Sequence, residues 1–573
     1  MATDQEHSVT EDEQQARTVR GIGVSPGRAA GPVAQMAAPI AEPRSRRGLP
    51  FNSDLDAAAQ SVAEHAQRVA QGLEEAAQRA GGASRDVLQT TAQMATDPML
   101  VTAAQAYVRD ERLSPPWAVW EAAADVAGQL TELGGYMAER VRDVVDVRDR
   151  IVASLEGLPM PGVPQRHDPF VLVAVDLAPA DTALLDPSKV RAIVTEQGGP
   201  TSHTAILSRS LGIPAVVGVA RALQELNANT TVLVDGAAGT VTLHPTAEQV
   251  AEAERQAAQS RTFSGVGRTA DGHRVELLAN VGEPGGATAA AEAGAEGIGL
   301  FRTEFCFLDR AEEPSVEEQV AQYRSVLRAF PGKKVVIRTL DAGADKPMPF
   351  LTDTDEPNPA LGVRGLRTSW RNPKILSNQL DAIAQAAELE DAEVWVMAPM
   401  VATVDEAEEF VAACARRGLQ TAGVMVEVPS AALLAGPILA RAAFASIGTN
   451  DLIQYVMAAD RLLGSLASLA DAFQPAVLRM IEATCTGGAQ QARPVGVCGE
   501  AAADPATAVA LVGLGVTSLS MSPHSLADVA AVLEATPLTR CQELARLAME
   551  AESAEEARSI VRGGLPVLGE LGL

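Results

Sequence analysis

The chain has 573 residues, a formal net charge of −27 at pH 7 and 47% apolar residues. This length accommodates about three domains of ordinary size, and the apolar content argues against wholesale disorder. The strong negative charge disfavours binding to nucleic acid or to anionic lipid; it fits a basic protein partner, and it fits equally well a surface that is acidic only for solubility.

No stretch of the sequence indicates export or membrane insertion. No apolar run reaches the roughly 18 residues that a membrane-spanning helix needs. Residues 1–18 are polar and acidic and lack the apolar segment of a secretory signal, so we expect a flexible tail there. The cysteines show no paired spacing, which argues against a disulfide framework or a Cys-x-x-Cys metal site and predicts a cytoplasmic protein.

Strand-like and helix-like zones alternate in the first half of the chain. Residues 19–47 hold short apolar stretches between glycines and prolines, which predict one or two strands with turns. Residues 53–158 have helical spacing after a plausible N-cap at Ser53, and their prolines indicate an antiparallel bundle of about four helices. Strand patterns return over 165–246, at 170–175, 192–195, 215–219 and 231–234. We therefore expect one α/β domain, formed by 19–47 and 165–246, with the bundle inserted into it.

The second half of the chain alternates short apolar runs with helix-like spacers. After a linker helix expected over 247–272, eight such runs in 273–573 are typical of a (β/α)8 TIM-type barrel, whose parallel strands are buried on both faces. The predicted fold class is thus α/β multidomain. The expected barrel strands are 275–280, 297–304, 334–340, 393–400, 423–428, 444–451, 494–500 and 518–522.

The C-terminal ends of these strands, where such barrels place their active sites, carry charged side chains and a thiol. Arginine matches phosphate and carboxylate oxygens with paired hydrogen bonds, and Mg²⁺ prefers one or two carboxylates together with substrate phosphate. A single arginine in such a place is more often part of a surface ion pair, but the whole set favours a site for a small phosphorylated carboxylic acid. The set consists of Arg302, Arg338, Glu427, Asp451 and Cys498, with Arg461 after the sixth strand.

A second candidate site lies in residues 198–206, which read Gly-Gly-Pro-Thr-Ser-His-Thr-Ala-Ile. Apolar strand residues precede this run and a helix is expected to begin within it, so His203 falls near a helix N-terminus. That position favours a neutral, nucleophilic imidazole and afterwards stabilises an attached phosphate. A lone histidine in a glycine-rich loop is more often structural. No P-loop or dinucleotide-binding motif is present.

These segments resemble Enzyme I of the bacterial sugar phosphotransferase system, the phosphoenolpyruvate–protein phosphotransferase family, over about residues 21–540. Residues 198–206 are similar to the family's phosphohistidine signature, and 297–305 and 446–451 are similar to its barrel signatures. The resemblance implies transfer of the phosphoryl group from phosphoenolpyruvate to a histidine and then to the phosphocarrier HPr, with release of pyruvate. It also implies Mg²⁺ as cofactor, a bundle that docks HPr, a homodimer formed through the barrel domain, and a role in sugar uptake.

The resemblance further implies a role for each matching residue. His203 would be phosphorylated at Nε2, and Cys498 would protonate the departing enolate. Glu427 and Asp451 would hold Mg²⁺. The residues that would bind phosphoenolpyruvate are Arg302, Arg338, Asn450, Asp451 and Arg461.

The sequence departs from the family pattern at two places. Ala178 stands where the family usually has threonine, which removes a hydroxyl that could orient the His203 imidazole. Arg461 is followed by Leu462 and Leu463 where the family usually has glycine and polar residues, so the local loop is expected to differ.

Two other functions share parts of this pattern. A pyruvate phosphate dikinase or phosphoenolpyruvate synthase has both modules, but it carries a further nucleotide-binding domain, and the bundle and the α/β domain already fill the residues before the barrel. A regulatory module would bind phosphoenolpyruvate or a phosphorylated partner without turnover. The presence of His203, Cys498, Glu427 and Asp451 argues against that second alternative.

Overall fold

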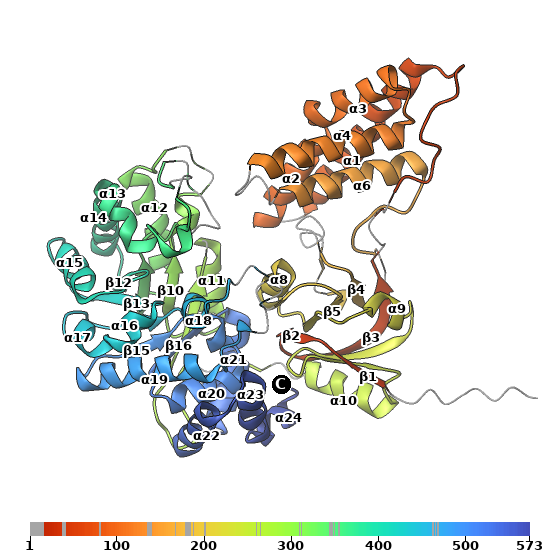
Figure 1. The fold of residues 1–573 in the computed structure, drawn as a ribbon. Helices are drawn as coiled ribbons and strands as arrows, with labels where there is room; N and C mark the ends of the chain where they lie inside the picture. Colours follow the sequence, from red (N-terminus) through yellow and green to blue (C-terminus); the bar gives the residue numbers. More distant parts are fainter. Residues whose placement is uncertain are drawn as a thin grey trace, which may run out of the picture. The chain divides into compact units, whose positions relative to one another are not determined.

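The computed structural model divides the chain into two compact units, residues 1–259 and 260–573 (Figure 1). None of the helices in the described part of the chain is both long and apolar enough to cross a membrane. The structure describes residues 17–36, 40, 42–79, 82–133, 140–164, 166, 168–177, 185–186, 188–199, 202–258, 261–263, 265–282, 284–308, 310, 312–342, 348, 350–352, 356–460, 463, 466 and 469–573.

The first unit contains an eight-stranded mixed sheet in the order β1-β8-β7-β3-β4-β5-β6-β2. The run β3-β4-β5-β6 is parallel, and the strands flanking it pair antiparallel. Residues 17–35 form three strands where the sequence predicted one or two, and β8 was not predicted. The strands are β1 (Arg17–Arg20), β2 (Ile22–Ser25), β3 (Arg28–Gln35), β4 (Phe170–Ala174), β5 (Val190–Thr195), β6 (Ala215–Val217), β7 (Thr231–Asp235) and β8 (Thr240–Leu243).

The two faces of this sheet are covered by different apolar clusters. Leu172 and Ile193 belong to the cluster that contains Ala205 of α8 (His203–Leu211). Val171 and Val194, one residue away along the same strands, belong to the cluster that contains Ala222 of α9 (Ala222–Glu225). This alternation is what a sheet buried on both sides requires.

A helical bundle connects β3 to β4. Because these two strands are neighbours in the sheet, paired at Val33 and Val171, the bundle is an insertion within the sheet domain, as expected. Five helices are described where about four were predicted. Pro98 and Pro115 occupy first helical positions, where the missing amide costs nothing. The helices are α1 (Leu55–Arg79), α2 (Gly82–Ala95), α3 (Pro98–Asp110), α4 (Pro115–Leu133) and α6 (Val141–Glu156).

Two details near the helix ends correct the sequence reading. The carboxylate of Asp54, rather than Ser53, accepts the amide of Ala57 at 3.0 Å and caps α1. The expected linker helix ends early: α10 (Ala247–Ala258) packs on β3 and does not continue to residue 272. Gly265 has a φ of +82°, a backbone conformation that a continuing helix cannot contain.

The second unit is a closed barrel of eight parallel strands, which confirms the predicted fold class. Pairing of β16 with β9, with Leu519 opposite Leu277, closes the ring. The strands are β9 (Glu276–Val281), β10 (Ile298–Arg302), β11 (Lys334–Arg338), β12 (Glu393–Ala398), β13 (Ala422–Val426), β14 (Ala445–Ile447), β15 (Val495–Val497) and β16 (Ser518–Met521).

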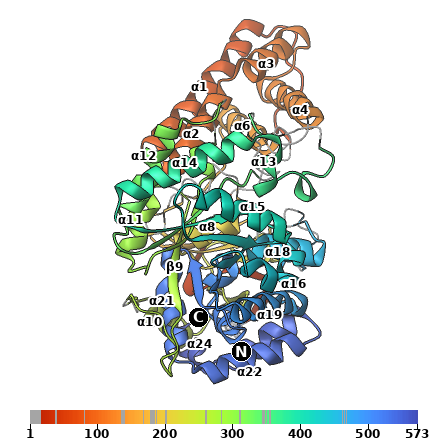
Figure 2. The same ribbon diagram turned by 90° about the vertical axis from the view of Figure 1, so that its left-hand side faces the viewer.

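Helices surround this barrel, as Figure 2 shows for α14, α15, α16 and α19. They are α11 (Pro284–Glu292), α12 (Val316–Leu327), α13 (Thr368–Arg371), α14 (Pro373–Leu389), α15 (Val404–Ala415), α16 (Pro429–Leu433), α17 (Ala435–Leu439), α18 (Thr449–Met457), α19 (Pro475–Gln490), α20 (Pro505–Gly513), α21 (Leu526–Glu534), α22 (Leu538–Glu550), α23 (Ala554–Gly563) and α24 (Pro566–Leu571).

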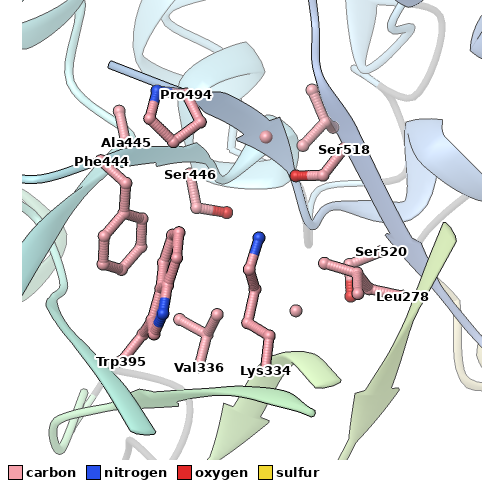
Figure 3. A pocket seen from close by; sticks show the side chains of 13 residues that line it. Leu278, Lys334, Val336, Trp395, Phe444, Ala445, Ser446, Pro494, Ser518 and Ser520 are labelled. Carbon is pink, nitrogen blue, oxygen red and sulfur yellow. The ribbon is translucent and has the colours of Figure 1, made fainter. Parts of the chain in front are cut away.

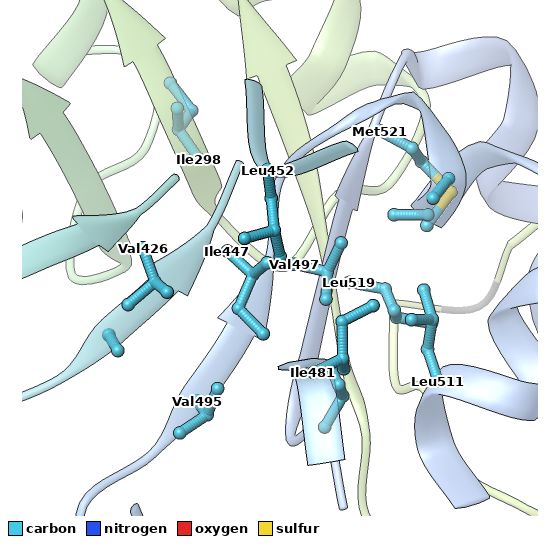
Figure 4. Close-up of a cluster of buried hydrophobic side chains, with 14 of the residues drawn as sticks. Ile298, Val426, Ile447, Leu452, Ile481, Val495, Val497, Leu511, Leu519 and Met521 are labelled. Atoms are coloured by element: carbon cyan, nitrogen blue, oxygen red, sulfur yellow. The ribbon is translucent and has the colours of Figure 1, made fainter. Parts of the chain in front are cut away.

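The barrel strands bury one set of side chains outward against the helices and another set inward. Figure 4 shows Ile447, Val497 and Leu519 from three adjacent strands beside Ile481 of α19 and Leu511 of α20. Each such fully buried side chain stabilises the fold by about 1.5–3 kcal/mol. The inward set is a separate cluster made of Leu300, Val336, Met397, Met425, Phe444 and Cys498.

Seven of the eight predicted barrel strands extend too far at their C-terminal ends, the first being the exception. The sixth was expected over 444–451, but β14 ends at Ile447 and α18 begins at Thr449. Asp451 therefore lies in the first turn of a helix. The polar residues that follow each strand lead the chain out of the sheet. The residues that mark the candidate site therefore lie just after the strands and not within them.

Candidate active site

Charged side chains from several strand ends meet at the C-terminal end of the barrel. Arg338 is the last residue of β11, Glu427 follows β13, and Cys498 follows β15. Glu304 begins a short 3-10 helix after β10, and Asp451 belongs to the first turn of α18 after β14. These five side chains come from five different connections, and each has little or no exposure to solvent.

Carboxylates and arginines alternate through this cluster. Nη2 of Arg338 lies 2.8 Å from Oε1 of Glu304, and its Nη1 lies 3.4 Å from Oδ2 of Asp341. The same Oδ2 lies 3.0 Å from Nη2 of Arg364, whose Nη1 lies 2.9 Å from Oδ1 of Asp451. Arg364 thus joins Asp341 to Asp451, and one continuous set of ion pairs runs from β10 to α18.

Sequence reasoning missed Arg364 and Asp341, because neither residue ends a predicted strand. Arg364 is 6% exposed and stands in the long connection between β11 and α13. It precedes Gly365, which has a φ of +57° and whose added Cβ would lie 2.7 Å from Cβ of Met400. The only sign of its role in the sequence is an arginine next to a glycine in a long connection. Without a structure, that pattern does not predict a site residue.

The acids around the arginines hold them in the charged form. Burial by itself would lower the pKa of the Arg338 guanidinium, but Glu304, Asp341 and Glu427 outweigh burial and raise that pKa. The pKa of Arg364 is raised in the same way, against burial, by Asp341 and Asp451. Both guanidiniums remain positive at any working pH, which makes them suitable partners for an anionic substrate.

Glu427 has the properties of a cation ligand. It is 2% exposed, and its Oε2 accepts the amide of Met400 at 2.8 Å. Burial, followed by the charges of Asp451 and Asp341, raises the pKa of Glu427. Its other oxygen lies beside Gly448, where an added Cβ would stand 2.7 Å from it. A buried carboxylate with repelling neighbours gains most from a bound cation.

The donor set therefore fits Mg²⁺ when it is supplied together with substrate. Within the described residues, no three His, Cys, Asp or Glu side chains form a cage for a metal ion. Mg²⁺ commonly uses only one or two protein carboxylates and completes its shell with substrate phosphate and water. Glu427 and Asp451 match that requirement.

Cys498 lies at the floor of this site. Its side chain is 2% exposed and belongs to the inward-facing apolar cluster of the barrel. The Sγ atom lies 3.6 Å from the carbonyl oxygen of Ile447. The nearby Ser446 hydroxyl lowers the pKa of the thiol and so offsets part of the effect of burial. Burial raises the pKa of the Cys498 thiol to about 11. The thiol is thus protonated at neutral pH, as a proton donor must be.

The remaining predicted site residues in the barrel are less fully defined. Arg302 ends β10 with an exposed side chain, and Asn450 lies half-buried in the first turn of α18. Arg461 lies outside the described residues, and so does Ala178 in the first unit.

His203 is the first residue of α8, and the sequence predicted a position near a helix N-terminus. Ser202 caps this helix, its hydroxyl accepting the amide of Ala205 at 3.3 Å. Thr204 is fully buried and donates from Oγ1 to Oδ1 of Asp176 at 3.1 Å, which fixes the first turn against the loop after β4. The His203 side chain itself is outside the described part of the chain.

Three family models match the chain in succession. They are the N-terminal domain of PEP-utilising enzymes at residues 20–140, the mobile domain at 167–239 and the PEP-binding domain at 255–537. These ranges correspond to the bundle with its flanking strands, the sheet with α8, and the barrel.

Curated relatives match over nearly the whole chain. A phosphoenolpyruvate–protein phosphotransferase of Streptomyces coelicolor is 48% identical over 96% of this chain and 99% of its own length. Those of Geobacillus stearothermophilus and Staphylococcus carnosus are 34% and 38% identical, over 95% and 81% of this chain and 98% and 84% of their own lengths. The chain belongs to the phosphoenolpyruvate–protein phosphotransferase (Enzyme I) family, and it is an enzyme of phosphoenolpyruvate-dependent phosphoryl transfer.

The bridging role of Arg364 leads to a prediction about stability. Arg364→Met leaves Asp341 and Asp451 without their shared cation, and we expect the barrel unit to lose about 3 kcal/mol of unfolding free energy. Hydrogen exchange in urea, read on peptides from β11 and α18, measures this loss apart from the other unit.

Arg367→Met provides the matched control, because Arg367 pairs with Glu406 through a partly exposed side chain. That substitution should cost about 1 kcal/mol or less. Equal losses for the two variants would contradict a special role for Arg364.

Proposed function

We propose that His203 accepts the phosphoryl group of phosphoenolpyruvate, that an HPr-type phosphocarrier receives it next, and that pyruvate is released, as the first step of sugar uptake in the cytoplasm. The observation that carries this proposal is the barrel cluster in which Arg338 and Arg364 alternate with Asp341 and Asp451. Family membership supports the chemistry, and the position of His203 at the start of α8 supports its role as acceptor.

Phosphoenolpyruvate presents a phosphate and a carboxylate on a three-carbon frame. Arg302, Arg338 and Arg461 bind these groups in our proposal, with contacts from Asn450 and Asp451. The buried Nε of Arg338 has no hydrogen-bond partner within the described residues, which leaves donor capacity for a ligand. Guanidinium groups that are fixed before the substrate arrives stabilise transferring phosphate without reorganising.

Glu427 and Asp451 hold Mg²⁺ in this proposal. The ion would draw charge from the phosphate oxygens as the bond to the enol oxygen breaks. The protein's own part is to keep the two carboxylates together, through the amide of Met400 on Glu427 and through Arg364 on Asp451. Because both partners are donors, the two acids can stay close and ionised when the cation is present.

Loss of the phosphoryl group leaves an enolate, which must gain a proton at carbon to become pyruvate. We assign this proton to Cys498, whose buried thiol faces the barrel interior. Its raised pKa makes the thiol a weak acid, but an enolate carbon is a strong base, so transfer from sulfur to carbon is favourable.

The two proposed reaction sites belong to different units, and His203 must visit both the substrate and the carrier. We therefore propose that a hinge or swivel motion carries His203 between them. His203 lies in residues 1–259 and the substrate cluster lies in residues 260–573. We propose that the bundle α1–α6 docks the carrier, and that the barrel unit forms a homodimer. The acidic net charge of −27 suits a basic carrier.

The first functional prediction concerns the acceptor. His203→Ala should abolish labelling by ³²P-phosphoenolpyruvate while binding of phosphoenolpyruvate to the barrel persists. Gel autoradiography and calorimetric titration measure the two properties. His524→Ala, which changes an exposed histidine of the barrel unit, is the control and should label normally. Phosphate found on another histidine of the His203→Ala protein would exclude this assignment.

The second prediction concerns the cation. Glu427→Gln and Asp451→Asn should each slow labelling of His203 by about 100-fold or more, because the cation contributes several kcal/mol to the transition state. Rapid-quench labelling across Mg²⁺ concentrations measures the rate and its metal dependence. Full turnover in the presence of excess chelator would refute the metal requirement.

The third prediction concerns the proton donor. Cys498→Ala should still label His203 but should release an enolate that solvent protonates on either face. Turnover of phosphoenolpyruvate labelled at C3 in deuterated water tests this through the chirality of the pyruvate methyl group. Wild type should give one enantiomer and Cys498→Ala a racemate. Retention of both full turnover and chirality in the variant would show that Cys498 is only a core residue.

The raised pKa adds a pH dependence to this third prediction. A thiol donates its proton only while protonated, so the acid form is present below the pKa and is lost as pH rises through about 11. Facial selectivity of wild type should therefore persist to about pH 10, whereas an unperturbed thiol would begin to lose it near pH 8.5.

A further inference from the structure

The barrel interior contains a second polar space, at the end opposite the active site. It lies where the strands begin, since Lys334, Ala445 and Ser518 are the first residues of β11, β14 and β16. The free space is about 20 Å³, and a single water needs about 10–15 Å³. The space is therefore large enough for one water. Figure 3 shows the hydroxyls of Ser446 and Ser518 and the ammonium of Lys334 directed into it.

Two inward glycines make room for the serine side chains that line this space. A Cβ added at Gly496 would lie 2.4 Å from Oγ of Ser518, and one added at Gly299 would lie 2.5 Å from Oγ of Ser520. Most small barrels fill such positions with apolar groups. Here glycines on two strands leave room beside serines on two others, and the space is lined by groups that can hold a water molecule.

Partly exposed side chains connect the cavity to solvent. Lys334 approaches it with a side chain that is 13% exposed and forms an ion pair with Glu276. The side chains of Trp395 and Ser518, which also line it, are only half-buried. Nζ of Lys334 lies 4.1 Å from the centre of the Trp395 ring, which fixes the ammonium at the cavity. A cation there orients a water with its oxygen toward the ammonium and its hydrogens toward the serines.

Ser446 connects this cavity to Cys498. In the barrel register Ser446 lies opposite Gly496 and Ile447 lies opposite Val497, so Ser446 is one inward layer below the thiol. The amide of Cys498 bonds to the carbonyl of Ile447 at 3.1 Å, which holds this register. The Ser446 hydroxyl is directed into the cavity, and it also lowers the pKa of the Cys498 thiol one layer above, against the effect of burial.

Two uncharged polar groups act on the Cys498 thiol, the carbonyl of Ile447 and the hydroxyl of Ser446, and only the hydroxyl can return a proton to it. The carbonyl oxygen of Ile447 accepts a hydrogen bond but has no proton to give. The Ser446 hydroxyl both donates and accepts. The other neighbours of the thiol in the inward cluster, Leu300, Val336, Met397 and Met425, are apolar.

We propose that Ser446 is a positioning residue that relays a proton from water in the lower cavity to Cys498. This inference rests on the proposed role of Cys498 as proton donor. In each turnover the S–H bond breaks and its proton forms the new C–H bond of pyruvate. The resulting thiolate takes the hydroxyl proton of Ser446, and Ser446 takes one from the cavity water, which recovers it from bulk solvent. One solvent proton is consumed for each pyruvate, and nothing is oxidised or reduced.

The relay restores the donor while the active-site mouth is still covered by substrate or product. Solvent reaches the thiol from below, through the beginnings of the strands, and the phosphoryl-transfer site above stays dry. Such separation protects the enolate from water, which would otherwise protonate it on either face.

An isotope-trapping experiment tests the relay. The full-length protein is saturated with phosphoenolpyruvate in ordinary water without Mg²⁺ and then diluted into deuterated water for a variable delay. Mg²⁺ starts a single turnover, and the protium content of the pyruvate methyl group is measured by mass spectrometry. The dependence on delay gives the rate at which the Cys498 proton exchanges beneath bound substrate.

Wild type should deliver mostly deuterium after a short delay. Ser446→Ala should retain protium over delays at least about tenfold longer, a modest effect for the loss of a positioned proton carrier. Phosphohistidine formed in the same quenched samples should keep its wild-type amplitude in Ser446→Ala. A purely structural loss would lower that amplitude and leave the isotope ratio unchanged.

Two further variants make the result specific. Ser518→Ala removes a hydroxyl from the same cavity without touching Cys498, and its exchange rate should stay within about twofold of wild type. Gly496→Ala brings a methyl group to within 2.4 Å of Oγ of Ser518, so the Ser518 side chain must shift into the water space. This variant should slow exchange as Ser446→Ala does, which provides a second test if Ser446→Ala does not fold. Exchange in both Ser446→Ala and Gly496→Ala at the wild-type rate, or equal slowing in Ser446→Ala and Ser518→Ala, would overturn the relay.

The same experiment separates this inference from the function on which it rests. If wild type forms no phosphohistidine, or if its pyruvate is racemic at the methyl carbon when substrate labelled at C3 is used, the proposed function has failed. If wild type behaves as expected and only the Ser446→Ala prediction fails, the relay alone is wrong.

Discussion

Two buried carboxylates that stay close together need positive charge nearby, and at the barrel mouth Arg364 supplies part of it. Its guanidinium lies between Asp341 and Asp451, at 3.0 and 2.9 Å, and the chain of ion pairs continues through Arg338 to Glu304. Removing one member of such a set leaves an uncompensated charge in a low dielectric, which costs more than the pair contributes when intact. These ion pairs therefore fix the positions of the charged side chains before any ligand binds.

This electrostatic constraint extends into the backbone. Arg364 reaches the mouth only because the segment containing Gly365 packs closely against Met400, and the amide of Met400 in turn holds Glu427. Gly448 has no side chain, so the turn into α18 approaches Glu427 and brings Asp451 to the same side. Glu427 and Asp451 are thus held in place relative to each other. The contacts that hold them are those of Arg364, of the two closely packed glycines and of the Met400 amide.

The elements with strong periodicity could be predicted from sequence, while the contacts between distant loops could not. The eight barrel strands followed from short apolar runs, and Arg338, Glu427 and Cys498 followed from their places at strand ends, because a parallel strand delivers its C-terminal residue to one rim. Arg364 was missed since no periodic pattern surrounds it. Asp451 was placed on a strand, although it lies in a helical turn, because the polarity that ends a strand resembles the polarity of a site. The short strand β8 was missed, because its alternating threonines carry a weak apolar signal.

The parallel pairing of β3 with β4 has a consequence for how the helical bundle could have entered the chain. Two neighbouring parallel strands need a connection that runs back along the length of the strand, whereas antiparallel neighbours can be joined by a tight turn. The bundle is that return path, so it cannot simply be deleted and closed with a two-residue hairpin. A chain lacking it would still need a crossover of about a dozen residues or more. Any ancestral form of this domain must then have possessed some connecting segment at this point. The bundle is best regarded as the enlargement of an obligatory crossover, whose helices could diverge while the sheet that carries α8 stayed unchanged.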